Sequence, residues 1–386
     1  MPERPTPPEA YRAINPEKQP EKKDSGYESA ERIEQLMKQE RREHDERLGE
    51  VIDAFVLRRN DDEAGKLDVV AKTLIARRDD KKTTAKIRTL ILALSGAARG
   101  AYGTGQLAAL WEAGITPREI DDCVGISAGS ASLLYYLGGH EHTYKGASIY
   151  THVLQKNGFV SFSVKRWPKI MNVFVAVKAF LKGPRAVDQS AVLAAPSRFW
   201  VVAQNTGTQK NELVDAKTDL INAVHASMAV PYFYGEKIQL RGGAYIDGAF
   251  AQIPFEEIIK TCKPTHILVM PNMPFEELVN FKISNGILKA VEWLLPEQGT
   301  AGVFKKVLRG EADIKSLRLA CDEMSAHYGV KIGWLWPPDC ALAATTTDRA
   351  LLLKAMLASA KDAYRKFNKN NPDPGKREKR DFPFWN

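Results

Sequence analysis

Residues 87–94 (IRTLILAL) form a near-continuous apolar run of strand length, and a glycine-rich turn and a helical pattern follow it directly. A strand that is apolar on both faces is typical of a parallel sheet whose two faces are covered by helices. The alternation continues, with strands expected at 199–203, 244–246, 266–269 and 330–335 and helices at 216–228, 276–294, 301–327 and 347–367. The sequence therefore predicts an α/β fold, in which a mostly parallel central sheet lies between two helical layers.

The first 85 residues have a different composition. Residues 1–25 are rich in proline and charge, which predicts disorder. Residues 27–58 carry apolar residues at helical spacing together with many charges, and a shorter helix is expected at 65–78. We therefore expect a disordered and helical extension over 1–85, in which 27–58 is a candidate site for an activating protein partner, and a folded domain over 86–386.

Charge is unevenly distributed along the chain. Its formal net charge is +8, whereas residues 1–80 hold 16 Lys and Arg against 20 Asp and Glu. The positive excess therefore lies after residue 80, and it suits an anionic membrane, a nucleic acid or an acidic substrate.

The four cysteines form no CxxC pair, which excludes a disulfide scaffold and argues against a structural zinc site. No apolar run is long enough to span a membrane and the chain starts without a secretory signal pattern, so we expect a cytoplasmic location.

The pentapeptide Gly125-Ile126-Ser127-Ala128-Gly129 has the GxSxG pattern, and it lies between a predicted strand and a predicted apolar helix. This is the setting of a nucleophile elbow, in which a strained turn lifts the serine hydroxyl out of the sheet. Gly125 and Gly129 give the turn room, and the helix N-terminus places N–H groups near the serine. Ser127 is the candidate nucleophile.

The glycine-rich turn is formed by Gly96, Ala97, Ala98, Arg99 and Gly100. A dinucleotide-binding turn of the short-chain dehydrogenase type also needs a Tyr-x-x-x-Lys pair, which does not occur after this turn. A phosphate-binding P-loop is excluded because the chain has no GxxxxGK[ST] pattern. The third interpretation is an oxyanion hole, made of backbone N–H groups aimed at a developing alkoxide beside Ser127.

Asp247, Gly248 and Ala249 follow another predicted strand, and Asp247 is a candidate general base for Ser127. A Ser-Asp-His triad would instead need a histidine, for which the candidates are His225, His266 and His327. A metal site at His140 and His142 is not expected, because these residues have i,i+2 spacing in a predicted loop without a third ligand nearby.

The three motifs, in this order, closely resemble those of the patatin-like phospholipases: LSGAARGAYGTG, VGISAGSAS and YIDGAFAQIPF. The stretch NAVHASMAVPYFY is similar to the family's block before the aspartate, and DRALLLKAMLASAKDAYRKF is similar to its closing helix. The resemblance covers residues 88–367, with the motifs within 88–260.

This resemblance implies a three-layer patatin-like fold and a Ser-Asp dyad, with Ser127 as nucleophile, Asp247 as base and the 96–100 turn as oxyanion hole. It implies hydrolysis of acyl esters in phospholipids or related lipids through an acyl-enzyme, without a metal, an organic cofactor or a nucleic acid. The chain departs from the family's Gly-Gly-Gly-x-Arg-Gly run at Ser95 and Ala97, and alanine does not take positive φ cheaply. A catalytically weak or inactive binding module and a histidine-triad esterase are therefore the alternatives.

Residues 159–182 mix Phe and Trp with Lys and Arg. A helix from 169 places one apolar set on a single face: Ile170, Val173, Phe174, Val177 and Leu181. Such a helix is either an interfacial or lid element or a helix that faces the core. We expect peripheral association with a membrane surface.

Overall fold

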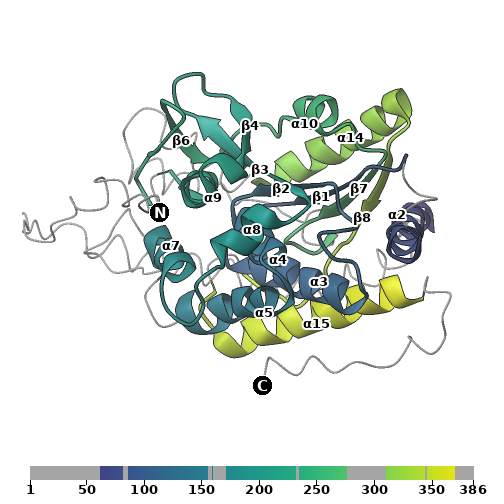
Figure 1. The fold of residues 1–386 in the computed structure, drawn as a ribbon, viewed down its shortest axis with the longest axis horizontal. Helices are drawn as coiled ribbons and strands as arrows, with labels where there is room; N and C mark the ends of the chain where they lie inside the picture. Colours follow the sequence, from purple (N-terminus) through teal and green to yellow (C-terminus); the bar gives the residue numbers. More distant parts are fainter. Residues whose placement is uncertain are drawn as a thin grey trace, which may run out of the picture.

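The computed structural model describes residues 61–80, 86–154, 159, 171–231, 234–275, 310–343 and 346–369. Within them, the chain forms one mixed sheet with helices on both faces, which confirms the α/β class and the mostly parallel sheet (Figure 1). The parallel part has the order β3-β2-β1-β7-β8. These strands are β1 (Thr89–Ala93), β2 (Asp122–Ile126), β3 (Arg198–Asn205), β7 (His266–Met270) and β8 (Lys331–Trp334).

Three further strands extend this sheet in antiparallel pairing: β4 (Asn211–Asp215), β5 (Ile238–Leu240) and β6 (Gly243–Asp247). The strands expected at 199–203, 244–246, 266–269 and 330–335 are confirmed as β3, β6, β7 and β8. Strands β4 and β5 were not predicted, because NELVD and IQL are too short to form a recognisable strand pattern.

The unbroken apolar run of β1 is explained by packing on both faces. Leu90 and Leu92 belong to the core cluster that contains α10 (Phe255–Cys262) and α14 (Gly310–Tyr328). Ile91 and Ala93 point the other way, into the cluster that contains α3 (Gly100–Glu112), α4 (Ala128–Leu137) and α15 (Arg349–Asn368). Successive strand residues alternate between the faces, so a strand covered on both sides must be apolar throughout.

Helix α2 (Asp61–Asp79), expected at 65–78, packs against β8 and lies beside α15 (Figure 1). A side chain at Gly333 of β8 would approach the backbone of Leu67 to 2.9 Å, so helix and strand are in close contact. Five apolar side chains of α2 belong to the same core as α3 and α4: Leu67, Val70, Ala71, Leu74 and Ile75. Helix α2, which the sequence analysis assigned to the extension over 1–85, therefore shares its core with α3 and α4.

The described residues form several further helices. They are α5 (His140–Ser148), a π-helical turn (Ile149–Val153), α7 (Val173–Leu181), α8 (Gln189–Ala194) and α9 (Leu220–Met228), with 3₁₀ turns at Ala97–Arg99, Ala216–Thr218 and Gly248–Phe250. The helix expected at 216–228 is thus a 3₁₀ turn followed by α9. The helices expected at 27–58 and 276–294, and the first part of the one at 301–327, lie outside the described residues.

Helix α7 starts at Val173 rather than at 169, and Ile170 lies outside the described residues. Its buried face is formed by Val173, Ala176, Val177 and Phe180. Leu181, expected on that face, is 36% exposed. The buried face therefore shares Val173 and Val177 with the expected one, but has Ala176 and Phe180 in place of Phe174 and Leu181.

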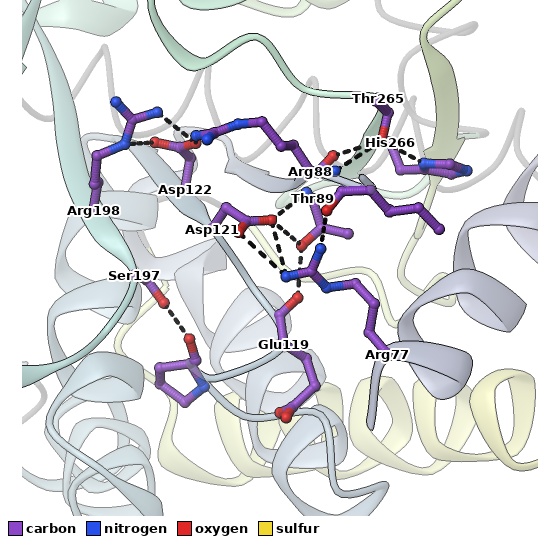
Figure 2. A network of polar contacts seen from close by, with 12 residues as sticks. Arg77, Arg88, Thr89, Glu119, Asp121, Asp122, Ser197, Arg198, Thr265 and His266 are labelled. Carbon is purple, nitrogen blue, oxygen red and sulfur yellow. Dashed lines mark hydrogen bonds and ion pairs between the residues drawn. The ribbon is translucent and has the colours of Figure 1, made fainter. Parts of the chain in front are cut away.

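A polar network holds the amino ends of the parallel strands (Figure 2). Asp122, 1% exposed, accepts hydrogen bonds from Arg88 (3.1 Å), Arg198 (2.9 Å) and the indole N–H of Trp200 (3.0 Å). Arg77 of α2 pairs with Asp121 at 3.2 Å. A buried carboxylate is stable only when it is paired in this way.

No described helix has the length and apolar character needed to cross a membrane.

Candidate active site

Ser127 lies in the sharp turn between β2 and α4, with φ 53° and ψ −119°. A non-glycine residue at positive φ is strained, and such strain is held in place by the surrounding packing. A side chain at Gly129 would collide with the carbonyl oxygen of Ala93, and one at Gly125 would lie 2.5 Å from the Cα of Ser130. The two glycines of the GxSxG pattern thus let α4 start directly against the sheet.

Strand register explains how Ser127 meets Asp247. Strand β2 pairs with β3 up to Ile126 opposite Val202, and β6 pairs with β3 from the next residue, with Asp247 opposite Ala203. Strand β4 overlaps both partners along β3, so β2 and β6 share the other edge of β3. The residue after Ile126 therefore lies beside Asp247, and the Ser127 hydroxyl donates to Asp247 Oδ2 at 2.6 Å.

Asp247 is 1% exposed, and its Oδ1 accepts the backbone N–H of Ala249 at 2.8 Å. Burial raises the pKa of this carboxyl to about 7, opposed by the hydrogen bonds from Ser127 and Ala249. Burial disfavours the charged form of a carboxyl, and a pKa near neutrality suits a general base. Gly248 has no room for a side chain, because a Cβ would collide with the carbonyl oxygen of Val202.

This environment predicts a pH dependence of stability. A carboxyl whose pKa rises on folding stabilises the fold below its unfolded pKa, and the stabilisation is lost as pH rises through about 7. Asp247→Asn should therefore be more stable than the native chain at roughly pH 8, by on the order of 2–4 kcal/mol, and the difference should shrink towards roughly pH 4. Chemical denaturation at several pH values measures it. An equal difference at every pH would contradict the raised pKa.

Ser227, in the last turn of α9, supports the elbow from behind. Its hydroxyl accepts the N–H of Ser127 at 2.9 Å and donates to the carbonyl of Val202 at 2.7 Å. Ser130 Oγ lies 2.9 Å from the same hydroxyl. The sequence analysis did not single out Ser227, although it lies in the NAVHASMAVPYFY stretch.

The turn at 96–100 follows β1 and opens α3, so it lies at the same edge of the sheet as Ser127. Ala97 has φ 49°, and it lines the same cavity as Ser127. Arg99 Nε donates to the carbonyl of Leu342 at 2.8 Å, and a side chain at Gly100 would collide with the hydroxyl of Tyr150. The alanine thus adopts the conformation that glycine takes freely, at a cost of about 1–2 kcal/mol.

A narrow cavity opens beside Ser127. Its walls are mostly apolar and come from α4, the π-helical turn, α7 and α9, through residues such as Ala131, Tyr135, Ile149, Leu154, Phe180 and Met228. The hydroxyl-bearing residues Thr104, Ser132 and Tyr150 also line it. The apolar lining suits the hydrocarbon part of an acyl group that reacts at Ser127.

The three candidate histidines lie elsewhere. His225 bonds to Tyr234 at 3.1 Å, and burial lowers its pKa to about 4. His266 starts β7, at the sheet edge opposite Ser127, and its Nδ1 lies 2.9 Å from the hydroxyl of Thr265. The ring of His327 stacks edge-on against Tyr328 at the end of α14. The structure brings Asp247 to Ser127 and none of these histidines.

His140 and His142 are on α5 rather than in a loop, and His140 Nε2 lies 2.7 Å from a carboxylate oxygen of Glu112. Among the residues that the structure describes, no three His, Cys, Asp or Glu side chains come together as a metal site.

Comparison with known proteins gave one family. Residues 92–259, which include Ser127 and Asp247, match the family model described as patatin-like phospholipase. A search of curated proteins found no match. Among solved structures, the chain is similar to the crystal structure of VipD from Legionella pneumophila, with 12% identity and a TM-score of 0.39, over 74% of this chain and 67% of that one.

Proposed function

Residues 92–259 form a patatin-like phospholipase domain, and on this premise we propose that the chain hydrolyses acyl esters of phospholipids or related lipids through Ser127 and Asp247. The family implies lipid acyl hydrolase chemistry in general. The observation that carries the finer proposal is the 2.6 Å hydrogen bond from the Ser127 hydroxyl to a buried carboxylate, at the mouth of an apolar cavity.

The proposed reaction has two steps. Ser127 Oγ attacks the ester carbonyl carbon while Asp247 takes the hydroxyl proton, and the oxyanion is stabilised by the backbone N–H groups of Ala97 and Ala98. The N–H of Arg99 is not available for this, because it bonds to the carbonyl of Gly96. Collapse breaks the bond to the lipid alcohol, which leaves with the proton from Asp247. Water then attacks the acyl-enzyme, Asp247 takes a proton again, and Ser127 is regenerated as the fatty acid leaves.

The apolar lining beside Ser127 supports an acyl substrate, because methylene groups that pack against it are removed from water. Each buried methylene contributes about 0.8 kcal/mol. The departure from glycine at Ser95 and Ala97 is the reason for keeping one alternative, a binding module without activity. A fluorophosphonate probe distinguishes the two, since a catalytically inactive module would not be labelled at Ser127.

The direct test is incubation of the full chain with vesicles of mixed phospholipids, with released fatty acid and lysolipid identified by mass spectrometry. We expect both products, and none from Ser127→Ala. Equal release by Ser127→Ala would reject the proposed nucleophile, and absence of both products from the native chain would reject the activity on phospholipids.

We also propose that the protein binds membranes peripherally from the cytoplasmic side. Residues after 80 carry the positive excess, and α7, a wall of the cavity, has exposed Lys178 and Leu181 on its outer side. Exposed charges are screened within about 8 Å at physiological salt. Sedimentation with anionic vesicles should therefore decrease from low to high salt. Equal binding to neutral vesicles would contradict this electrostatic component.

An activating partner at 27–58 stays a prediction.

A further inference from the structure

Asn272, two residues after the end of β7, is 1% exposed. Its Nδ2 donates to the carbonyl of Leu94 at 2.5 Å, and its Oδ1 accepts the N–H of Gly103 at 2.9 Å. Gly103 is in the first turn of α3. One buried amide therefore joins the end of β1 to the start of α3, the two ends of the 95–102 segment.

Asn272 also fills the space beside two glycines of this segment. A side chain at Gly96 would collide with the Cβ of Asn272, and one at Gly103 would lie 2.6 Å from its Oδ1. The amide is thus in contact with the backbone on both sides of Ala97. No motif in the sequence marks Asn272.

Ala97 lies between these anchor points at φ 49°, a conformation that alanine adopts only when its surroundings impose it. Arg99, held by the Leu342 carbonyl, anchors the turn on one further side. We propose that Asn272 is a positioning residue that holds Ala97 in the left-handed conformation and so orients the N–H groups of the turn towards the carbonyl that reacts at Ser127. This inference rests on the proposed function, and Asn272 acts through the turn rather than on the substrate.

The test is a double-mutant cycle in the full chain. Asn272→Ala should lower kcat by about 10- to 100-fold with little change in KM, because displaced oxyanion donors affect mainly the transition state. Glycine takes positive φ without cost. In the Ala97→Gly background, the same Asn272→Ala change should therefore lower kcat by less than about threefold. The difference between the two backgrounds measures the coupling between residues 97 and 272. An equal loss in both backgrounds would overturn the proposal.

Ser197→Ala is the matched control. Ser197 is fully buried and donates to the carbonyl of Pro117 at 2.6 Å, at the opposite edge of the sheet. It should lower Tm and leave kcat unchanged. If Asn272→Ala behaves like this control, Asn272 is merely structural. Should Asn272→Ala fail to fold, Asn272→Asp serves in its place, since it keeps the shape and the acceptor for Gly103 but lacks the amide donor to Leu94.

A crystal structure of the Asn272 variant provides a readout that needs no activity. We expect φ of Ala97 to become negative, and a retained positive φ would overturn the proposal even if the native chain hydrolyses no lipid. Conversely, a native chain without hydrolase activity but with this conformational change would reject the proposed function alone.

Discussion

Replacing Asp247 by asparagine is expected to lower the rate of ester hydrolysis by about 10²–10⁴-fold, the usual effect of losing a general base. Asparagine is nearly isosteric and can still meet the Ser127 hydroxyl, but it cannot take the proton. Ser127→Ala should lose at least as much. The double variant should be hardly slower than the slower single one, because nucleophile and base act as one unit. Initial rates on one phospholipid substrate measure all three.

Thermal melts of the same variants provide the control, since each must remain folded. Near-normal activity in Asp247→Asn, with Ser127→Ala inactive, would replace Asp247 by another base. Near-normal activity in Ser127→Ala would remove the elbow serine from the mechanism.

Deletion of residues 1–80 is expected to abolish cooperative folding, whereas deletion of 1–60 should retain it. The longer deletion removes α2, whose five buried apolar side chains cover β8, and it leaves Asp121 without Arg77. Burying one such large aliphatic side chain contributes about 1.5–3 kcal/mol, so their sum approaches the 5–15 kcal/mol by which domains of this kind are stable. Thermal unfolding of both truncated chains measures the difference.

A cooperative transition for the 1–80 deletion, with the native midpoint, would show that α2 is dispensable. That outcome would restore the boundary suggested by the sequence, where all predicted strands and motifs follow residue 86. Substitution of Leu74 by Ala in the full chain is the milder comparison, because Leu74 is 1% exposed and lies in the middle of this contact.

The parallel strands and the elbow could be predicted, because a strand buried on both faces leaves an unbroken apolar run and GxSxG has a local cause. The meeting of Ser127 with Asp247 could not be derived from spacing. It depends on strand register: β2 pairs with one edge of β3 up to Val202, and β6 pairs with the same edge from Ala203 onwards. Register is set only when the sheet is assembled.

Asn272 and Ser227 were missed for a related reason. Each acts through one side chain on a backbone group far along the chain, and a lone polar residue near a strand or helix end has no distinctive pattern. The place of α2 was missed because its helical periodicity says nothing about which surface it covers. The cost of Ala97, in contrast, was expected from its departure from glycine, and its φ of 49° falls where that cost applies.

The shared edge of β3 separates two quantities that are usually linked, the length of chain between two groups and the distance between them. Ile126, next to Ser127, and Asp247 pair with consecutive residues of one strand, so the 119 residues between Ser127 and Asp247 do not determine their spacing. The exposed hairpin turn at 207–210 is therefore a site for inserting a reporter domain or a foreign loop, with the reactive pair kept in place by the strand itself.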